Sequence, residues 1–307
     1  MFNKAPSNDD LRVFCAVVER AGFAAAAQDL GVSTAFVSKR VRLLETQLGA
    51  RLLHRTTRRV TLTESGERTY GWAQRILDDV DQLLQDVGDV AVQPRGGLRV
   101  CSSFGFGRMQ VAPALDALTQ RYPQLRVRLD LYDRLVDVAA EGFDLDIRVG
   151  DGVEPHLIAR PLADNHRVLC ASPQYLAQRG TPQSLKDLAH HDCLAIKERD
   201  HPLGVWRLHN RDREHAVKVS GALSSNHGEV VLRWALDGRG IVLRSMWQVA
   251  PLLQTGQLVQ VLPGWRQSAK IWAVYPLRLE RSAKLRVAVE FLADWFRHSV
   301  PREAAQG

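Results

Sequence analysis

Residues 22–59 read GFAAAAQDLGVSTAFVSKRVRLLETQLGARLLHRTTRR, and this stretch predicts two short helices around a tight turn, followed by a basic loop. The first helix runs from Phe23 to about Leu30 and is rich in alanine, which lets it pack close to a neighbour. Gly31 provides the break, because glycine adopts a left-handed backbone at no steric cost. Ser33 stands where an N-cap belongs, since its hydroxyl can satisfy an orphan backbone N–H of the second helix.

The second helix has one apolar face and one polar, cationic face. Its apolar residues recur at spacings of four, three and four, at Val37, Val41, Leu44 and Leu48. The opposite face carries Thr34, Ser38, Lys39 and Arg42. Any amphipathic helix with a solvated face can show this pattern. A helix that binds in the major groove of DNA also requires it, because one face packs on the rest of the domain and the cationic face remains free for DNA.

The surroundings of this helix favour DNA binding over a merely solvated face. Residues 33–60 contain seven Lys or Arg and one acid, Glu45. Such a local excess suits phosphate contacts, and short polar groups near the helix start suit base edges. Residues 54–66 (HRTTRRVTLTESG) suit a short hairpin, or wing, and residues 11–19 suit a helix behind the turn. We therefore predict a winged helix-turn-helix domain over residues 6–63, with DNA contacts at Ser33, Thr34, Ala35, Ser38, Lys39, Arg42, Arg55, Arg58 and Arg59.

The same stretch resembles the LysR-type transcriptional regulators. Their shared pattern is F-x-x-A-A-x-x-L-x-V-S-x-x-x-[VL]-S-[RK]-x-[VI]-x-x-L-E-x-x-L-G-x-x-L-[FL]-x-R-x-x-R-x-x-x-L-T-x-x-G, and this chain fills it from Phe23 to Gly66. One departure follows the capping serine, where the family often has Gln-Pro-Ala or Gln-Ser-Ala and this chain has Thr34-Ala35-Phe36. Because Thr34 lacks the two-pronged hydrogen bonding of glutamine, the operator sequence does not follow from relatives.

Residues 64–93 predict a long linker helix. Its apolar residues fall at spacings of four, four, three and four, close to a coiled-coil seam, at Trp72, Ile76, Val80, Leu83 and Val87. A lone helix cannot bury such a stripe, so it packs either on the N-terminal domain or on the same helix of a second subunit. The resemblance favours the second, because relatives dimerise through this helix. A homodimer or homotetramer presents paired reading helices to paired DNA half-sites.

The pattern changes after the breaker cluster at residues 94–97, where an effector domain over residues 94–303 begins. Strands are expected at 98–102, 125–131, 145–149, 167–171, 193–196, 217–223, 241–243 and 270–275, and helices at 111–122, 135–141, 175–178, 230–237 and 282–297. This alternation predicts parallel sheets with crossover helices and places the chain in the α+β multidomain class.

The resemblance to LysR-type regulators continues through this region. It is carried by AAEGFDLDIRVG at 139–150, LADNHRVLCASPQYL at 162–176 and LSSNHGEVVLRWALDGRGIVL at 223–243. The resemblance implies two α/β lobes similar to type 2 periplasmic binding proteins, joined by two crossing strands. Lobe I would comprise about 97–165 and 269–300, and lobe II about 166–268.

Ligands of open α/β sheets bind beyond the carboxyl ends of the strands, where helix N-termini converge. These ends predict effector contacts at Ser102, Ser103, Phe104, Asp133, Arg134, Arg148 and Asn226. Serine hydroxyls and backbone N–H groups suit an anion, and Arg134 or Arg148 could clamp a carboxylate. Helix capping and surface salt bridges are the alternative roles. Residues 143–150 and 102–108 also resemble regulators of hydroxy-dicarboxylate use, such as D-malate or tartrate catabolism.

Bulk properties are consistent with this picture. The net charge is +7, but residues 1–93 carry equal numbers of basic and acidic groups, so the excess lies in residues 94–307. That surplus hints at an anionic ligand, with a solvated surface as the alternative. The four cysteines lack pair or metal spacing and suit a reducing cytoplasm. No signal sequence or run of about 18 apolar residues occurs, so no membrane partner is expected.

No cofactor or metal is expected. Residues 190–193 (HHDC) could suggest a metal site, but adjacent residues rarely point at one ion. An enzyme with a DNA-binding appendage is disfavoured, because the chain contains no G-x-G-x-x-G, P-loop or H-E-x-x-H motif and SFGFG at 103–107 lacks the serine of a nucleophile elbow. A DNA-binding protein with an uncoupled ligand domain would share every residue. We predict a regulator, not an enzyme, whose partners are promoter DNA, a small carboxylate and further copies of itself.

Overall fold

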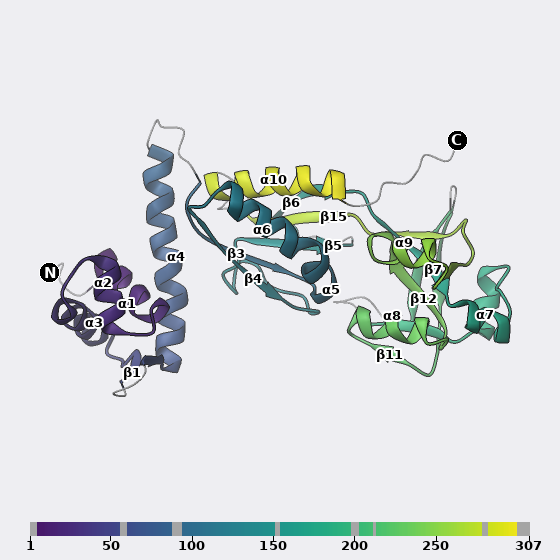
Figure 1. Cartoon of the computed structure of the whole chain (residues 1–307), viewed down its shortest axis with the longest axis horizontal. Helices are drawn as coiled ribbons and strands as arrows, with labels where there is room; N and C mark the ends of the chain where they lie inside the picture. The colour runs from purple at the N-terminus through teal and green to yellow at the C-terminus, as the bar shows by residue number, and fades with distance from the viewer. Residues whose placement is uncertain are drawn as a thin grey trace. The chain divides into compact units, whose positions relative to one another are not determined.

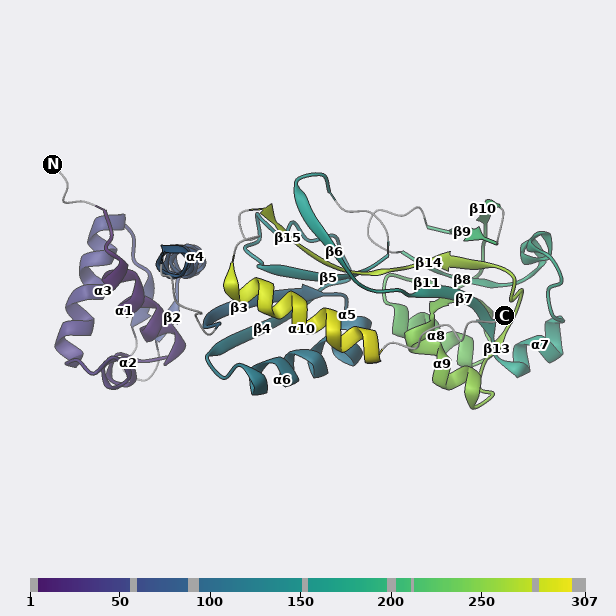
Figure 2. The same ribbon diagram turned by 90° about the horizontal axis from the view of Figure 1, so that it is seen from above.

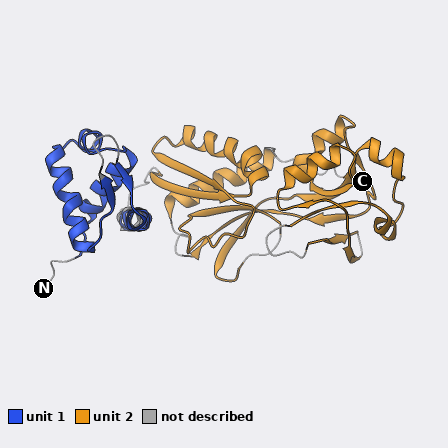
Figure 3. Cartoon of the chain, turned by 90° about the horizontal axis from the view of Figure 1, so that it is seen from below, with its two compact units in different colours: residues 1–92 blue, residues 93–307 orange. Residues whose placement is uncertain are grey.

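The computed structural model describes residues 5–55, 60–87, 94–150, 154–197, 203–210, 213–277 and 282–299. The chain divides into two compact units, residues 1–92 and residues 93–307, which are coloured separately in Figure 3. Within the described ranges, no helix is both long enough and apolar enough to cross a membrane.

The first unit is a winged helix-turn-helix domain followed by a long helix (Figure 1). Its elements are α1 (Asn8–Glu19), α2 (Phe23–Leu30), α3 (Thr34–Leu48), β1 (Leu53–Arg55), β2 (Val60–Leu62) and α4 (Glu64–Val87). Strands β1 and β2 pair antiparallel and form the predicted wing. Gly31 has the left-handed conformation, with φ of 65°, and the Ser33 hydroxyl accepts a 3.1 Å hydrogen bond from the Phe36 N–H, so the predicted break and cap are both confirmed.

Helix α1 begins earlier than the apolar pattern indicated. We expected a helix from residue 11, but Ser7 and Asp10 form a capping box that starts the helix at Asn8. The core of this domain lies between α1 and α3, where Phe14, Val17, Val37, Val41 and Leu44 are buried. Leu48, the last residue of the predicted apolar stripe, is instead exposed because the helix ends there at Gly49.

The second unit contains two sheets (Figure 2). The first has the strand order β4-β3-β5-β15-β6, formed by β3 (Gly96–Ser102), β4 (Leu125–Leu131), β5 (Leu145–Val149), β6 (Leu157–Ala163) and β15 (Ile271–Pro276). Strand β3 is parallel to β4 and β5, whereas β15 is antiparallel to β5 and β6. The accompanying helices are α5 (Phe104–Phe106), the π-helix η1 (Gly107–Val111), α6 (Ala112–Arg121) and α10 (Ala283–Ser299).

The second sheet has the order β10-β9-β14-β7-β12-β8-β11, and β13 pairs with β7. Its strands are β7 (His166–Ala171), β8 (Cys193–Ile196), β9 (Val205–His209), β10 (Glu214–Lys218), β11 (Ser224–Ser225), β12 (Ile241–Ser245), β13 (Val259–Gln260) and β14 (Arg266–Ser268). The helices are α7 (Pro173–Arg179), the 3-10 helix η2 (Leu185–His190), α8 (Gly228–Leu236) and α9 (Met246–Gln254).

Each sheet is the centre of one lobe, and the chain crosses between the lobes twice. It leaves the first sheet after β6 and returns to it before β15. Asn165 and Ala269 join the two crossing segments, because the Asn165 side-chain amide donates to the Ala269 carbonyl at 2.8 Å and the Ala269 N–H donates to the Asn165 carbonyl at 3.0 Å. The crossings are therefore fixed to each other at the base of the lobes.

The second unit differs from the sequence prediction in several places, and β6, β9, β14 and α9 were not expected. Residues 135–141 were expected to form a helix but form a turn, in which the Asp137 carboxylate accepts from the Ala140 N–H at 2.9 Å while Val136 and Val138 pack with Phe143. The strand expected at 217–223 ends at Lys218. The sheets are mixed rather than wholly parallel. In the first sheet β15 is antiparallel to β5 and β6, and in the second sheet β7 is antiparallel to β12 and β14.

Candidate functional site

The first candidate surface is the exposed face of α3. We call this helix the reading helix. Thr34, Ala35, Lys39 and Arg42 are exposed on it, and Ser38 is half-buried beside the packed face. Ser33 is exposed and its hydroxyl is engaged as the helix cap. Six of the predicted DNA contacts thus lie at or on this helix. Arg55 belongs to β1, and Arg58 and Arg59 lie outside the described residues.

The second candidate site is a cavity of about 600 Å³ between the two lobes of the second unit. Lobe I contributes the ends of β3 and β5 and the segment after β4, and lobe II contributes the start of α8 and the end of β12. We call this cavity the cleft. Four predicted effector residues line it: Ser103, Asp133, Arg148 and Asn226.

Ser102 and Phe104 are not among the residues that line the cleft, and both make contacts within the protein. The buried Ser102 hydroxyl donates a 2.7 Å hydrogen bond to the Ile147 carbonyl oxygen and so links β3 to β5. The Phe104 N–H donates to Asp133 Oδ1 at 3.1 Å, and its ring lies 5.5 Å from the ring of His227 in lobe II. The adjacent Ser103 is the serine that faces the cavity.

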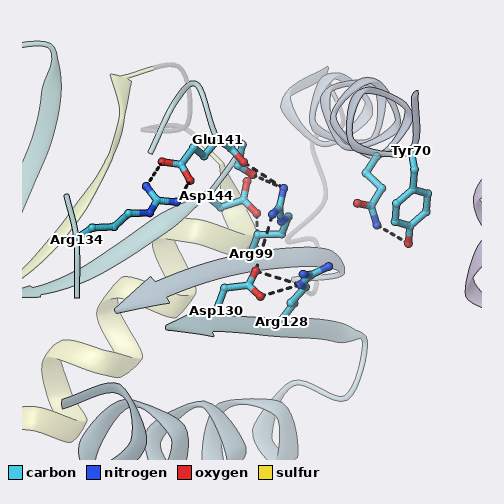
Figure 4. A network of polar contacts seen from close by, with 9 residues as sticks. Tyr70, Arg99, Arg128, Asp130, Arg134, Glu141 and Asp144 are labelled. Carbon is cyan, nitrogen blue, oxygen red and sulfur yellow. Dashed lines mark hydrogen bonds and ion pairs between the residues drawn. The ribbon is translucent and has the colours of Figure 1, made fainter. Parts of the chain in front are cut away.

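Arg134 also lies outside the cleft lining. Figure 4 shows its guanidinium turned to the carboxylate of Glu141, where the two N···O distances are 2.7 and 2.6 Å. It also lies over the ring of Tyr132, 4.7 Å from the centroid. The hydrogen bond from Arg134 lowers the pKa of Glu141. Arg134 therefore has the surface salt-bridge role that we considered as its alternative.

Arg148 lies in the wall of the cleft but is already bound to acidic groups. Its Nε is 2.9 Å from Asp146 Oδ2, and its Nη1 is 3.0 Å from Glu154 Oε2. Burial opposes the charged form of Arg148, but the two carboxylates outweigh this effect and raise its pKa. A ligand carboxylate would have to compete with both protein carboxylates for this guanidinium.

Sequence reasoning missed three arginines of lobe II that line the cleft, Arg167, Arg207 and Arg244. Arg244 is only 8% exposed and donates from Nε to Gln248 Oε1 at 2.8 Å. Its guanidinium packs against Gly228 at the start of α8, where an added Cβ would come within 2.5 Å of Nη1. The signal in the sequence was an arginine within the otherwise apolar strand IVLRS (241–245).

Several contacts connect the lobes at this cavity, among them the edge-to-face pair of Phe106 and Trp247, whose ring centroids lie 5.2 Å apart. Arg108 of η1 forms a salt bridge with Glu229 of α8, and the Phe104 ring lies against the ring of His227 at an interplanar angle of 35°. Asp133 Oδ2 lies 4.0 Å from His227 Nε2. Because Asp133 and Glu229 also line the cleft, a bound molecule would touch residues that hold the lobes together.

The remaining acidic, histidine and cysteine side chains of the described residues form no cluster suited to a metal ion. No group of three or more His, Cys, Asp or Glu side chains there could hold a metal ion. The four cysteines are buried and form no disulfide, and burial raises the pKa of Cys170 and of Cys193 to about 12. Such thiols are poor nucleophiles near neutral pH.

Comparison with known proteins assigns both units. A family model described as a bacterial regulatory helix-turn-helix protein of the lysR family matches residues 8–67, and one described as a LysR substrate binding domain matches residues 91–297. The chain is 60% identical to the HTH-type transcriptional regulator DmlR of Escherichia coli K12 over 299 residues, which cover 97% of each chain. It is 50% identical to the HTH-type transcriptional activator TtdR of the same strain over 295 residues, covering 96% and 95%.

Solved structures with the same architecture include CrgA, a LysR-type transcriptional regulator from Neisseria meningitidis. That structure has a TM-score of 0.59 and 32% identity, covering 95% of this chain and 99% of CrgA. The full-length virulence activator AphB of Vibrio cholerae has a TM-score of 0.58 and 27% identity, covering 94% and 99%. Both domains of the chain therefore have counterparts joined in the same order.

Proposed function

Since the chain belongs to the LysR family of transcriptional regulators, we propose that it binds promoter DNA as a dimer or a dimer of dimers and responds to a small hydroxy-dicarboxylate. The observation that carries this proposal is the presence, in one chain, of a capped cationic reading helix and an arginine-lined cavity between two lobes. A DNA target and four buried cysteines that form no disulfide fit a cytoplasmic location.

For DNA binding, we propose that Ser33, Thr34, Ala35, Ser38, Lys39 and Arg42 meet the major groove and that Arg55, Arg58 and Arg59 of the wing meet phosphates. The reading helix is long enough to place its first turns against base edges, as in other helix-turn-helix proteins. Cationic side chains further along the helix are suited to contact the phosphates of the DNA backbone. Such contacts contribute affinity but little sequence discrimination.

For assembly, we propose that α4 pairs with the same helix of a second copy. Ala73 and the half-buried Leu77 contact the core of the N-terminal domain, which leaves a different stripe available. On that stripe Trp72 is 62% exposed and Leu83 is 61% exposed, and Ile76 is exposed as well. An apolar stripe of this size on a charged helix gains stability by packing on a partner.

For the effector, we propose an anion with two carboxylates and at least one hydroxyl. Arg244 and Arg167 can bind carboxylates, whereas Ser103, Asn226 and Ser245 offer hydrogen bonds to hydroxyl groups. The resemblance to regulators of D-malate or tartrate catabolism, together with the identity to DmlR and TtdR, supports these two acids as first candidates.

Effector binding would alter the relation between the lobes and thereby the packing of effector domains in the assembly. A ligand has this effect only when it binds one arrangement more tightly than the other. The interlobe contacts Arg108–Glu229 and Phe104–His227 lie where such a preference can arise.

The test is footprinting of the purified protein on the intergenic DNA upstream of its own gene, with excess competitor DNA. We expect two protected sites spaced by whole helical turns, and a change in protection or in transcription from that promoter when D-malate or tartrate is added. Sequence-selective protection without any response to a panel of dicarboxylates would contradict the effector assignment. Absence of selective protection would contradict the DNA-binding proposal.

A further inference from the structure

A large aromatic side chain stands at the start of the reading helix. Phe36 is 43% exposed, on the third residue of α3, although the helix has an apolar core available on its opposite face. Its neighbours Thr34, Ala35 and Ser38 are short. The phenyl ring is therefore the largest side chain in the first turn of the helix.

This ring is held in place by the rest of the domain. The Phe36 N–H is fixed by the Ser33 cap at 3.1 Å, and the guanidinium of Arg40 lies over the ring at 5.8 Å from the centroid. Arg40 is itself anchored to α1, because its Nε is 2.9 Å from Asp10 Oδ1 and its Nη2 donates to Ser7 Oγ at 2.9 Å. Asp10 is buried, so the anchor belongs to the core of the domain.

An apolar ring at position 36 is suited to contact an apolar group on a DNA base. In the major groove the only apolar group that a base pair presents is the C5 methyl of thymine, and phenylalanine is one of the side chains that contacts it. The first residues of a reading helix are those that reach base edges. A preorganised ring there loses little side-chain entropy when it meets such a methyl group.

We propose that Phe36 is a specificity-determining residue that reads a thymine methyl group in each half-site. The inference rests on the proposed DNA-binding function. It specifies one base of each half-site, a thymine, and the residue that recognises it. Leu43 provides an internal comparison, because it is equally exposed, at 42%, on the same helix but two turns further from its start. Leu43 is not expected to read a base.

The experiment begins by enriching a duplex from a randomised DNA library with the full-length wild-type protein. Each thymine of the enriched duplex is then replaced by deoxyuridine, which removes only the methyl group. Affinities are measured for wild type, Phe36→Ala and Leu43→Ala. We expect one thymine per half-site at which the replacement weakens wild-type binding about fourfold, which corresponds to about 0.8 kcal/mol for one buried methyl group.

The decisive quantity is the coupling between the two changes. Phe36→Ala should bind the thymine and deoxyuridine duplexes equally, whereas Leu43→Ala should keep the wild-type difference. A deoxyuridine penalty that persists unchanged in Phe36→Ala, or no penalty at any position in wild type, would overturn the assignment. Phe36→Gln, a substitution by a good helix former at an exposed site, is the second variant, and it must also lose the penalty.

The outcomes separate the two levels of the argument. A wild-type protein that enriches no sequence overturns the proposed DNA-binding function and this assignment with it. The wild-type protein could instead enrich a sequence for which the deoxyuridine penalty is the same in wild type and in Phe36→Ala. That result overturns the assignment of Phe36 and leaves the proposed DNA-binding function intact.

Discussion

Arg148 and Asp146 form a buried ion pair in the wall of the cleft. The distance from Arg148 Nε to Asp146 Oδ2 is 2.9 Å, and the two side chains are 2% and 3% exposed. Both belong to β5 and are two residues apart, so they lie on the same face of the strand. A residue that the sequence suggested as a ligand clamp is thus part of the internal structure of lobe I.

Removal of Asp146 should destabilise the protein. Asp146→Ala leaves the buried Arg148 with fewer carboxylate partners, and breaking a buried pair in this way costs about 3–5 kcal/mol of unfolding free energy. Denaturant unfolding of the effector-free protein measures the change. The control is Arg128→Ala, which breaks the ion pair between Arg128 and Asp130. Because the Arg128 side chain is 65% exposed, this variant should lose less than about 1 kcal/mol of unfolding free energy. Equal stability of the two variants would contradict a buried structural pair.

Effector binding should depend on Arg244 and not on Arg134. Arg244 lines the cleft, whereas Arg134 is bound to Glu141 outside it. Loss of a charged hydrogen bond to a carboxylate costs about 1.5–3 kcal/mol, so Arg244→Ala should weaken D-malate or tartrate binding by about 10- to 100-fold. Calorimetric titration of both variants tests this. A loss of affinity in Arg134→Ala but not in Arg244→Ala would reverse our assignment of the carboxylate site.

The salt bridge between Arg108 and Glu229 should affect the relation of the lobes more than overall stability. Its side chains are 63% and 30% exposed, so Arg108→Ala should change the unfolding free energy by no more than about 1 kcal/mol. If the effector binds the lobe arrangement that this pair stabilises, the apparent Kd of Arg108→Ala for the effector should rise by about two- to fivefold, because a smaller fraction of the protein adopts that arrangement. Exchange of the two residues, Arg108→Glu with Glu229→Arg, should restore affinity. Unchanged binding in the single variants would exclude the pair from closure.

The exposed stripe of α4 should control assembly. Leu83→Asp places a charge where we propose a helix–helix seam, and sedimentation analysis should show dissociation of the dimer at concentrations where wild type is associated. DNA affinity should fall by at least about tenfold, because paired half-sites are no longer bound together. Glu64→Gln, on the same helix with a side chain 85% exposed, is the matched control. A Leu83→Asp protein that remains dimeric would place the interface elsewhere.

The buried thiols predict a loss of stability at high pH. The pKa of Cys170 and of Cys193 is raised to about 12 from an ordinary value of 9.0. Between pH 9 and 12 the unfolded chain releases thiol protons that the folded chain retains, so stability falls as pH rises, and it is unaffected by these groups below pH 9. At pH 8 both thiols should react with iodoacetamide about a thousandfold more slowly in the native than in the unfolded protein. Native labelling at the unfolded rate would contradict their burial.

The local part of the fold could be predicted from the sequence because its signals act within a few residues. The left-handed Gly31, the Ser33 cap and the spacing of Val37, Val41 and Leu44 specify the turn and the second helix through contacts between near neighbours. The same locality explains one failure. Apolar residues at 135–138 resembled a helix, but Val136 and Val138 are buried by Phe143 and Cys101 in a turn.

The sequence by itself determined the winged helix-turn-helix and the long helix after it, and its resemblance to LysR-type regulators implied the two α/β lobes. Only the tertiary structure decided which side chains reach the cavity between the lobes. Ser102 ends β3 and its hydroxyl is bonded to the Ile147 carbonyl of the neighbouring strand, whereas Ser103, which follows the strand, lines the cleft. It also brought Arg244 of lobe II and Ser103 of lobe I, which are far apart in the sequence, into the lining of one cavity. A site formed where two lobes meet depends on long-range packing, and local spacing carries no information about it.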